Sequence, residues 1–339
     1  MKRTCIAALA LTLFFACHDT AKAPPPSATT ANAVRTSRVA TVRFKPDSLG
    51  VEKRVIVYLP HDYDTSAKRY PVFYYLHGLT GDETSWTRGG HLDEAADAMK
   101  LDAIIVMPDG DDSFYIDSKR FPDYDACIAS ADGLFISSEN RSTTCVRTAN
   151  YETYVVKDLI GYVDSHYRTI PTRDGRGIAG MSMGGYGALM LAARHPDLFA
   201  ATASHSGVDS LFYEGPLPYD AARAKIFNGD LRSWGADAEP IGAWLRGILG
   251  TDDRANWDAH DPVTLLTKLG PGKLAIYLDC GTEDGFHLDA AAAYLHDQLT
   301  ANHIDHVFFL GPGQHDFSFW VPREPESLKF LRDHTTAAK

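Results

Sequence analysis

The 339-residue chain has little of several features that mark whole classes of protein. It holds only five cysteines and contains neither a CxxC nor an HxxxH pair, so no zinc site is predicted, and no other metal or cofactor is expected. Its 23% of charged residues and 45% of apolar residues are ordinary globular values, which exclude a collagen, a disordered chain and a polytopic membrane protein. No internal repeat is present.

Positive charge is also scarce. The chain has 33 lysines and arginines against 44 aspartates and glutamates, a net charge of −11. Residues 1–40 carry five basic residues and one acidic residue, a net of +4, so the remaining chain carries −15. A folded part this acidic has no electrostatic attraction for nucleic acid or for an anionic membrane surface. Polyanionic substrates are not expected either.

The N-terminus is built like an export signal. Lys2 and Arg3 precede an apolar run over residues 5–17, which is too short to span a bilayer. Residues 13–17 read LFFAC and resemble a bacterial lipobox ending in a lipidated Cys17, although Phe14 departs from the usual leucine. We therefore predict a lipoprotein-type signal peptide over residues 1–16, and an exported protein that meets a membrane only through this lipid.

Two alternatives remain open at this end of the chain. Ala21 and Ala23 offer the small residues that an ordinary signal peptidase requires, which would give a periplasmic or secreted protein, and an uncleaved anchor is the other possibility. Residues 17–38 are rich in Pro, Ser, Thr and Ala without apolar periodicity, which predicts a disordered tether. Residues 39–335 then form one well-buried domain.

The remaining cysteines are consistent with an oxidising compartment. Cys127 and Cys145 flank a polar stretch, so a disulfide closing a surface loop is the simplest reading, with two free thiols as the alternative. Cys280 follows an apolar strand pattern and is expected to be buried and inert.

Strand and helix patterns alternate along the domain. Strands are predicted at 39–44, 54–59, 71–76, 103–107, 177–180, 200–204, 274–278 and 306–310. Helices are predicted at 92–100, 152–168, 186–195, 288–299 and 326–334. Fully apolar strands that alternate with amphipathic helices indicate an α/β fold with a mostly parallel central sheet and helices on both faces, and the opening strands suggest an antiparallel edge.

One region interrupts this alternation. Residues 207–272 contain three tryptophans, several glycines and prolines, and no clear strand. Because the region lies between two sheet strands, it is predicted to be a small helical excursion over the carboxyl ends of the strands, where α/β sheets bind ligands. The alternative is an insertion remote from any site.

The strongest motif is G-x-S-x-G at residues 180–184, between a predicted strand and a predicted helix. This context is typical of a nucleophile elbow, a turn so tight that Gly180 and Gly184 must lack side chains. The elbow presents Ser182 above the sheet, at a helix N-terminus whose free N–H groups favour developing negative charge.

A nucleophilic serine needs a base and an acid that orients the base, and hydrolases with such an elbow place them later in the chain, acid first. Asp284 lies in a glycine-bracketed loop after the strand at 274–278, with Glu283 as the runner-up and Asp279 less favoured because it belongs to the strand end. His315 follows the last strand in a glycine-rich loop and is the predicted base.

Other histidines fit the role of base less well. His287 lies only three residues after Asp284, and His205 precedes the acid, although His205 could still line the site. For the oxyanion hole, the backbone N–H groups of Met183 and Leu79 are the candidates, because Met183 follows the nucleophile and Leu79 follows the strand at 71–76. A plain turn after that strand is the alternative reading of His77 and Gly78.

The chain resembles the esterase D and feruloyl esterase group of α/β-hydrolases, which also contains S-formylglutathione hydrolases and mycolyltransferases. The resemblance covers about residues 40–335 and rests on five motifs in order: LHGLTGDETSW (76–86), MPDG (107–110), GMSMGGYGAL (180–189), CGTED (280–284) and GQHDFSFW (313–320). It implies the same triad, Ser182, Asp284 and His315, and the same oxyanion positions.

The resemblance favours hydrolysis over acyl transfer. Mycolyltransferases carry Glu as the acid and a basic residue soon after the Gly-Leu turn, where this chain has Asp284 and Thr80. We expect an exported serine esterase that acts on small-molecule or glycan esters, such as carbohydrate-linked or phenolic esters of feruloyl or acetyl type. An acyltransferase and a non-catalytic binding protein on the same scaffold are the alternatives. Neither the oligomeric state nor the identity of the acyl group follows from the sequence.

Overall fold

The computed structural model describes residues 37–118, 123–129, 145–235 and 241–339. The predicted signal peptide (1–16), Cys17 and almost all of the tether (17–38) lie outside the described residues, so they remain predictions. Within the described part, no helix combines the length and the apolar character that crossing a membrane requires.

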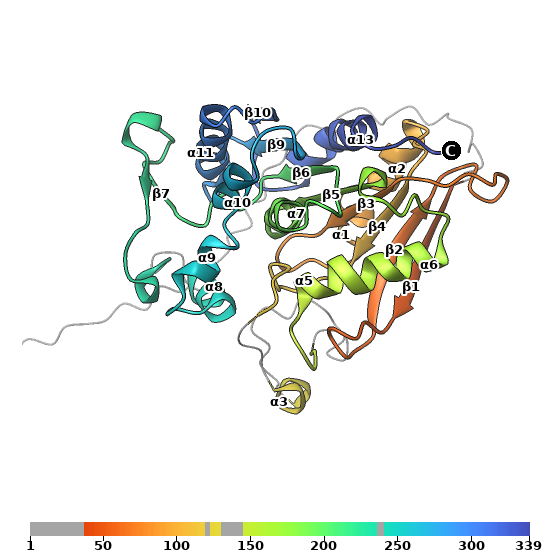
Figure 1. Cartoon of the computed structure of the whole chain (residues 1–339), viewed down its shortest axis with the longest axis horizontal. Coiled ribbons are helices and arrows are strands. Elements are labelled where there is room, and N and C mark those ends of the chain that lie inside the picture. Colours follow the sequence, from red (N-terminus) through yellow and green to blue (C-terminus); the bar gives the residue numbers. More distant parts are fainter. Residues whose placement is uncertain (1–36, 119–122, 130–144, 236–240) are drawn as a thin grey trace, which may run out of the picture. The chain divides into compact units, whose positions relative to one another are not determined.

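A central sheet of eight strands organises the domain, in the order β1-β2-β4-β3-β5-β6-β9-β10 (Figure 1). The strands β1 and β2 are antiparallel, as are β2 and β4, and all other neighbours are parallel. The predicted antiparallel edge and parallel centre are therefore confirmed. The strands are β1 (Arg38–Phe44), β2 (Lys53–Leu59), β3 (Val72–Leu76), β4 (Ile104–Pro108), β5 (Arg176–Met181), β6 (Ala201–His205), β9 (Ala275–Gly281) and β10 (Val307–Gly311).

Helices cover both faces of this sheet because the central strands are apolar on both sides. In β3, Val72, Tyr74 and Leu76 enter one core, and Phe73 and Tyr75 enter the other. The first core also holds α5 (Tyr151–Thr153), the π-helix Tyr154–Leu159, α6 (Ile160–His166), α7 (Met183–Arg194) and α11 (Leu288–Ala301). The second core holds α1 (Ser85–Arg88), α2 (Leu92–Ala98), α12 (Phe317–Trp320) and α13 (Glu324–Asp333). Figure 1 shows α6 and α7 on one side and α2 and α13 on the other.

The parallel register brings the strand ends together. Leu76 pairs with Gly180, Gly180 with Ser204, and Ser204 with Leu278. The loops that follow β3, β5, β6, β9 and β10 therefore leave the sheet at one edge. All the predicted catalytic residues belong to these loops or to the helices that start there.

The predicted excursion, residues 207–272, is partly as expected. It contains α8 (Ile241–Leu249), α9 (Arg254–Asp258) and α10 (Pro262–Leu269), but it also contains a two-stranded sheet, β7 (Tyr213–Gly215) with β8 (Lys225–Ile226), that was not predicted. These strands are only two or three residues long, too short to leave a pattern in the sequence. The helix α10 packs on α7, and the Tyr186 hydroxyl donates to the His260 carbonyl at 2.9 Å.

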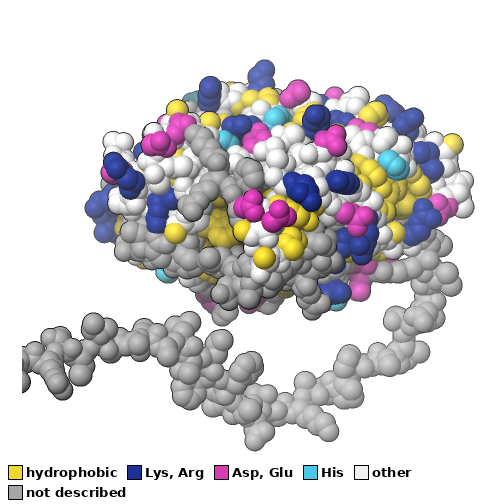
Figure 2. Space-filling view, turned by 90° about the horizontal axis from the view of Figure 1, so that it is seen from below, with side chains coloured by type: hydrophobic (Ala, Val, Ile, Leu, Met, Phe, Trp, Pro, Cys, Tyr) yellow, Lys and Arg dark blue, Asp and Glu magenta, His cyan; other side chains and the backbone are white. Residues whose placement is uncertain are grey.

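The structure pairs the two cysteines that were predicted to form a disulfide. Cys127 and Cys145 are bonded, with their Cα atoms 5.7 Å apart. Cys280 is free and buried, as expected. On the face seen in Figure 2, basic and acidic side chains are interspersed, with hydrophobic side chains between them.

Candidate active site

Ser182 stands at a strained turn between β5 and α7. Its φ of 53° and ψ of −120° lie outside the regions that ordinary residues occupy. The turn is possible only without side chains at its flanks, because a Cβ on Gly180 would lie 2.2 Å from the Gly184 carbonyl oxygen, and one on Gly184 would lie 2.2 Å from the Leu76 carbonyl oxygen. The Ser182 N–H donates to the His205 carbonyl at 2.8 Å, which ties the turn to β6. The predicted elbow is present.

His315 reaches Ser182 from the loop after β10. Its Nε2 lies 2.9 Å from Ser182 Oγ, and its Nδ1 lies 2.7 Å from Asp284 Oδ2. The imidazole ring contacts Phe286 and Trp320 in edge-on geometry, with ring centroids 4.9 and 5.1 Å away. These aromatic contacts restrict the ring to the orientation in which both nitrogens face their partners.

The Asp284 carboxylate contacts His315, whereas Glu283, the alternative considered from the sequence, is exposed to solvent. The Asp284 side chain is fully buried, its Oδ1 accepts the Phe286 N–H at 2.8 Å, and the Cys280 thiol lies 3.6 Å from Oδ2. Burial raises the pKa of that thiol far above its ordinary value, so Cys280 stays a neutral donor. Glu283 is exposed, and Asp279 lies within β9 and binds His205 Nδ1 at 2.9 Å.

His205 has a different place from the one considered in the sequence. It is fully buried beneath the elbow, where its ring contacts Asp279 and its backbone carbonyl holds Ser182. His287 occupies the N-cap of α11 in a left-handed conformation (φ 56°). Among the described histidines, His315 is the one whose ring reaches the serine hydroxyl.

Both oxyanion candidates lie beside Ser182. Met183 is the first residue of α7, so its N–H belongs to the helix end that lacks intrahelical acceptors. Leu79 lies in the turn Gly78 to Gly81, and a Cβ on Gly78 would be only 3.3 Å from the Ser182 Cβ. The turn therefore lies against Ser182, and a side chain at Gly78 would press on that serine.

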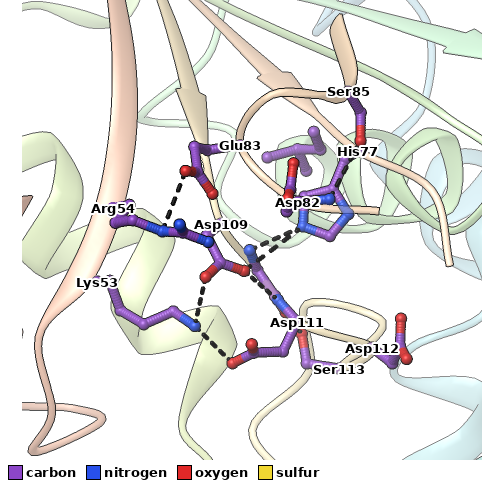
Figure 3. A network of polar contacts seen from close by, with 12 residues as sticks. Lys53, Arg54, His77, Asp82, Glu83, Ser85, Asp109, Asp111, Asp112 and Ser113 are labelled. Atoms are coloured by element: carbon purple, nitrogen blue, oxygen red, sulfur yellow. Dashed lines mark hydrogen bonds and ion pairs between the residues drawn. The ribbon is translucent and has the colours of Figure 1, made fainter. Parts of the chain in front are cut away.

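Behind this turn lies a buried polar network that the sequence analysis missed (Figure 3). Lys53 is fully buried in β2, and its Nζ lies 3.0 Å from Asp109 and 2.7 Å from Asp111. Tyr151 also donates to Asp111. The available signal was weak: a lysine inside an apolar strand, and the run of acidic residues at 109–112 directly after a buried strand.

Burial and charge act against each other in this network. Burial disfavours the charge of Lys53, but Asp109 and Asp111 outweigh it, so the pKa of Lys53 is raised. Burial also opposes the charge of Asp109, but the positive charge of Lys53 outweighs it, so the pKa of Asp109 is lowered. Burial raises the pKa of Asp111 to about 7, with the nearby charge of Asp109 adding to the effect. Lys53 therefore pairs with two carboxyl groups, Asp109 and Asp111, whose pKa values are shifted in opposite directions.

Apolar side chains lie close to Leu79 and to His315. Leu79, Phe114, Ile241 and Trp244 pack together with no room for a water molecule between them, so α8 of the excursion reaches the turn that carries Leu79. Phe286 is 60% exposed although its ring contacts His315. A larger hollow of about 740 Å³ lies at the opposite ends of the strands, where β9 and β10 begin. None of the predicted site residues lines it. We place the site at Ser182 because the hydrogen-bonded groups converge there.

Among the residues that the structure describes, one further group of side chains has metal-ligating atoms close together. Atoms of His61, Asp62 and Asp102 lie within 4.8 Å of one another. However, Asp62 already accepts hydrogen bonds from Lys68 and Tyr70, at 2.7 and 2.8 Å. None of these three residues is among the predicted site residues.

The sheet order and the serine elbow at its carboxyl edge define an α/β-hydrolase. The chain belongs to the family described as "Putative esterase", whose model matches residues 47–331. It is therefore a member of a family of ester hydrolases.

Individual relatives agree with this assignment. The chain is 34% identical over 171 residues to Esterase Rv1288 of Mycobacterium tuberculosis, covering 50% of this chain but only 32% of that relative, about a third of its length. It is 29% identical over 300 residues to the S-formylglutathione hydrolase of Bos taurus, covering 86% of this chain and 90% of that protein. The solved structure of an S-formylglutathione hydrolase from Agrobacterium tumefaciens has the same fold, with a TM-score of 0.65 at 20% identity, covering 90% and 98% of the two chains.

Proposed function

We propose that the protein is a serine carboxylesterase that works through an acyl-enzyme intermediate, with Ser182 as nucleophile, His315 as base and Asp284 as the orienting acid. The observation that carries the proposal is the unbroken hydrogen-bonded series from Ser182 Oγ through both nitrogens of His315 to Asp284. Nucleophile, base and orienting group in hydrogen-bond reach of one another are the signature of this chemistry.

The reaction proceeds in two halves. As Ser182 Oγ bonds to the ester carbonyl carbon, His315 Nε2 takes the hydroxyl proton, and the same nitrogen then delivers it to the alcohol oxygen as the carbon–oxygen bond breaks. Water next attacks the acyl-enzyme and gives a proton to His315, which returns it to Ser182 as the acid leaves. Buried Asp284 stabilises the charged imidazole in both halves.

The negative charge of each tetrahedral intermediate needs donors that are already in place. The backbone N–H groups of Leu79 and Met183 fill this role in the proposal. Both flank Ser182, and one of them starts a helix, whose dipole favours an anion.

The surroundings of the site favour esters with a small apolar or aromatic acyl group. Carbohydrate-linked or phenolic esters of feruloyl or acetyl type belong to this class. Leu79, Phe114, Ile241 and Trp244 bring apolar side chains together at the turn next to Ser182. The exposed Phe286 ring beside His315 offers a flat face on which an aromatic or sugar ring can rest. The acidic chain disfavours a polyanionic substrate.

We also propose that the enzyme is exported and held to a membrane through lipidated Cys17. The support is the lipobox-like run at residues 13–17 and the paired Cys127 and Cys145, since disulfides persist in oxidising compartments. In the test, Cys17→Ser should move a membrane-associated protein to the soluble exported fraction or block its processing. A wild-type protein found soluble, with its N-terminus beyond Cys17, would remove the anchor.

The catalytic assignment is tested by removing the nucleophile and the base. Ser182→Ala and His315→Ala should each lower kcat by roughly 10⁴-fold or more, and the double variant should lose no more than either, because the residues act as one unit. Ser182→Ala should also prevent labelling by a fluorophosphonate probe. Persistent labelling of that variant would show that another residue is the nucleophile.

The acid has a matched control next to it in the chain. Asp284→Asn should lower kcat by about 10⁴-fold, since the amide no longer holds His315 in its productive tautomer. Glu283→Gln changes the exposed neighbouring carboxylate in the same way and should leave kcat within about threefold. Equal losses in the two variants would contradict the assignment of Asp284.

The substrate class is tested with p-nitrophenyl esters of increasing acyl length, followed by feruloyl and acetyl sugars and an S-acyl thioester. Phe286→Ala should raise KM for aromatic and sugar esters and leave acetate esters nearly unchanged. Adding an acceptor alcohol separates hydrolysis from acyl transfer. Preferential capture of the acyl group by the alcohol over water would make the protein an acyltransferase.

A further inference from the structure

Hydrogen bonds hold the two peptide groups on either side of Leu79. The Gly78 carbonyl accepts from His77 Nδ1 at 2.8 Å and from the Gly81 N–H at 3.1 Å. The Thr80 N–H donates to Asp112 Oδ1 at 2.6 Å. The peptide before Leu79 is thus fixed by its oxygen, and the peptide after it is fixed by its nitrogen.

The form of this turn is costly without such support. Thr80 has a φ of 64°, in the left-handed region that β-branched residues avoid. A positive φ at the third position of a four-residue turn belongs to type II, which normally has glycine there. Strain of this kind, of order 1–3 kcal/mol, persists only where the surroundings impose it. Asp112, which is 5% exposed, supplies that constraint through the Thr80 N–H.

The tautomer of His77 follows from its partners. The Gly110 N–H donates to Nε2 at 2.9 Å, so the proton of the neutral ring lies on Nδ1, which donates to the Gly78 carbonyl. The ring is 1% exposed, and burial lowers the pKa of His77, which keeps the ring neutral. Gly110 is itself fixed, because Lys53 binds the carboxylates on either side of it (Figure 3).

The sheet order gives the direction in which the Leu79 N–H points. Across a trans peptide bond the carbonyl of Gly78 and the N–H of Leu79 point in opposite directions. The Gly78 carbonyl faces the His77 ring, which lies toward Gly110 at the end of β4. Because β3 lies between β4 and β5, the opposite direction is that of β5 and Ser182.

We propose that His77 and Asp112 are positioning residues of the oxyanion hole, and that the buried Lys53 network orients His77, so that together they aim the Leu79 N–H at the carbonyl oxygen of a substrate bound to Ser182. The inference rests on the proposed function and adds to it the groups that set the donor's direction. Neither residue touches the reacting atoms.

The two bonds of His77 can be removed one at a time. In His77→Asn, the side-chain amide takes the place of Nδ1 and still donates to the Gly78 carbonyl. In His77→Gln, the side-chain carbonyl takes the place of Nε2 and still accepts from Gly110. Each variant loses one buried hydrogen bond, so similar losses of thermal stability are expected. Only H77Q releases the carbonyl that sets the direction of the Leu79 N–H.

We expect kcat of H77Q to fall about 10²-fold with KM within about threefold, and kcat of H77N to stay within about fivefold of wild type. Affinity for phenylboronic acid, which forms a tetrahedral adduct with a nucleophilic serine, should fall with kcat in H77Q only. The double variant Cys127→Ser/Cys145→Ser lies away from the turn and serves as a control that loses stability without losing kcat. Equal kcat losses in H77Q and H77N would overturn the inference.

Asp112 provides a second pair if either histidine variant does not fold. Asp112→Asn keeps an oxygen for the Thr80 N–H and should retain kcat within about threefold, whereas Asp112→Ala should lower it by at least tenfold. Equal kcat values for D112N and D112A would also overturn the inference. A wild-type chain that neither cleaves esters nor reacts with fluorophosphonate would instead remove the proposed function, and the inference with it.

Discussion

The two halves of the proposed active site are built in different ways. On one side of the substrate position, the elbow around Ser182 depends on glycines within two residues of the serine and on short backbone contacts. On the other side, the turn around Leu79 is held by the neighbouring His77 and by side chains from distant parts of the chain, at residues 53, 109, 111 and 112. The elbow requires that its glycines lack side chains, and the turn requires hydrogen bonds and ion pairs with buried polar side chains. Different substitutions should therefore damage each half.

The largest effect is expected at the elbow. Gly184→Ala adds a Cβ 2.2 Å from the Leu76 carbonyl oxygen, a backbone atom that cannot move away. We expect a loss of at least about 3 kcal/mol in the free energy of unfolding and no labelling of Ser182 by a fluorophosphonate probe. Chemical denaturation and probe labelling measure the two effects.

A glycine at an exposed position of a helix gives the matched control. A Cβ on Gly161, in α6, would meet nothing within 4 Å. Gly161→Ala should therefore leave activity unchanged and raise stability by up to about 1 kcal/mol, since alanine has the higher helix propensity. A Gly184→Ala protein as stable and active as Gly161→Ala would contradict the steric account of the elbow.

The charged half should respond next most strongly. Lys53→Met leaves Asp109 and Asp111 buried without their cation, and removing one partner of a buried ion pair costs about 3–5 kcal/mol. Adding Asp111→Asn should recover part of this loss, because one of the uncompensated acids is then neutral. Urea unfolding of the single and double variants measures the coupling between the two residues.

An exposed ion pair tests whether burial explains the large loss of stability expected for Lys53→Met. Arg43 and Glu52 lie 3.1 Å apart with both side chains more than half exposed. Arg43→Met should cost less than about 1 kcal/mol. Similar losses for Lys53→Met and Arg43→Met would show that the network behind the oxyanion turn has no special energetic role.

The disulfide belongs to neither half and should affect stability alone. Cys127 and Cys145 are 18 residues apart, and in the chain-entropy model closing a loop of this size stabilises the fold by roughly 3 kcal/mol. The double serine variant should lose that amount and keep its kcat. An unreduced digest of the wild type should yield the two linked peptides, and two separately alkylated peptides would contradict the bond.

The smallest effect concerns a buried acid without the partners that stabilise Asp111. Glu324 is fully buried, both of its carboxyl oxygens lack hydrogen-bond partners, and burial, with a contribution from Asp93, raises its pKa from 4.5 to about 9. Between these values the native state holds a proton that the unfolded state has lost. The free energy of unfolding should therefore fall as pH rises, by up to about 1.4 kcal/mol per pH unit.

Glu324→Gln removes this titration and keeps the shape of the side chain. The stability difference between wild type and variant should shift in favour of the variant from pH 6 to pH 8, measured by denaturation at each pH. Asp111 and Asp209, whose pKa values burial raises to about 7, contribute equally to both proteins and cancel in the comparison. Parallel stability curves would contradict the raised pKa of Glu324.

Most of the site could be predicted from the sequence because its chemistry follows chain order. Gly180, Ser182 and Gly184 are local to one strand–turn–helix unit, and the strands before Asp284 and His315 were apolar enough to locate. Parallel pairing then obliges the three loops to meet at the carboxyl ends of the strands, as the register of β5, β6, β9 and β10 shows. The disulfide could also be predicted, because few cysteines remained to be paired.

The tertiary structure decided what depends on contacts between distant residues. Asp284 and Glu283 are adjacent and chemically alike, and only the direction of the loop buries one against His315 and exposes the other. The contacts of Lys53 and His77 could not be predicted from the sequence, because a lysine in a strand and a histidine after one are common. These contacts arise when β2, β3 and β4 lie side by side and bury polar groups of three separate segments together, where each group must find a partner.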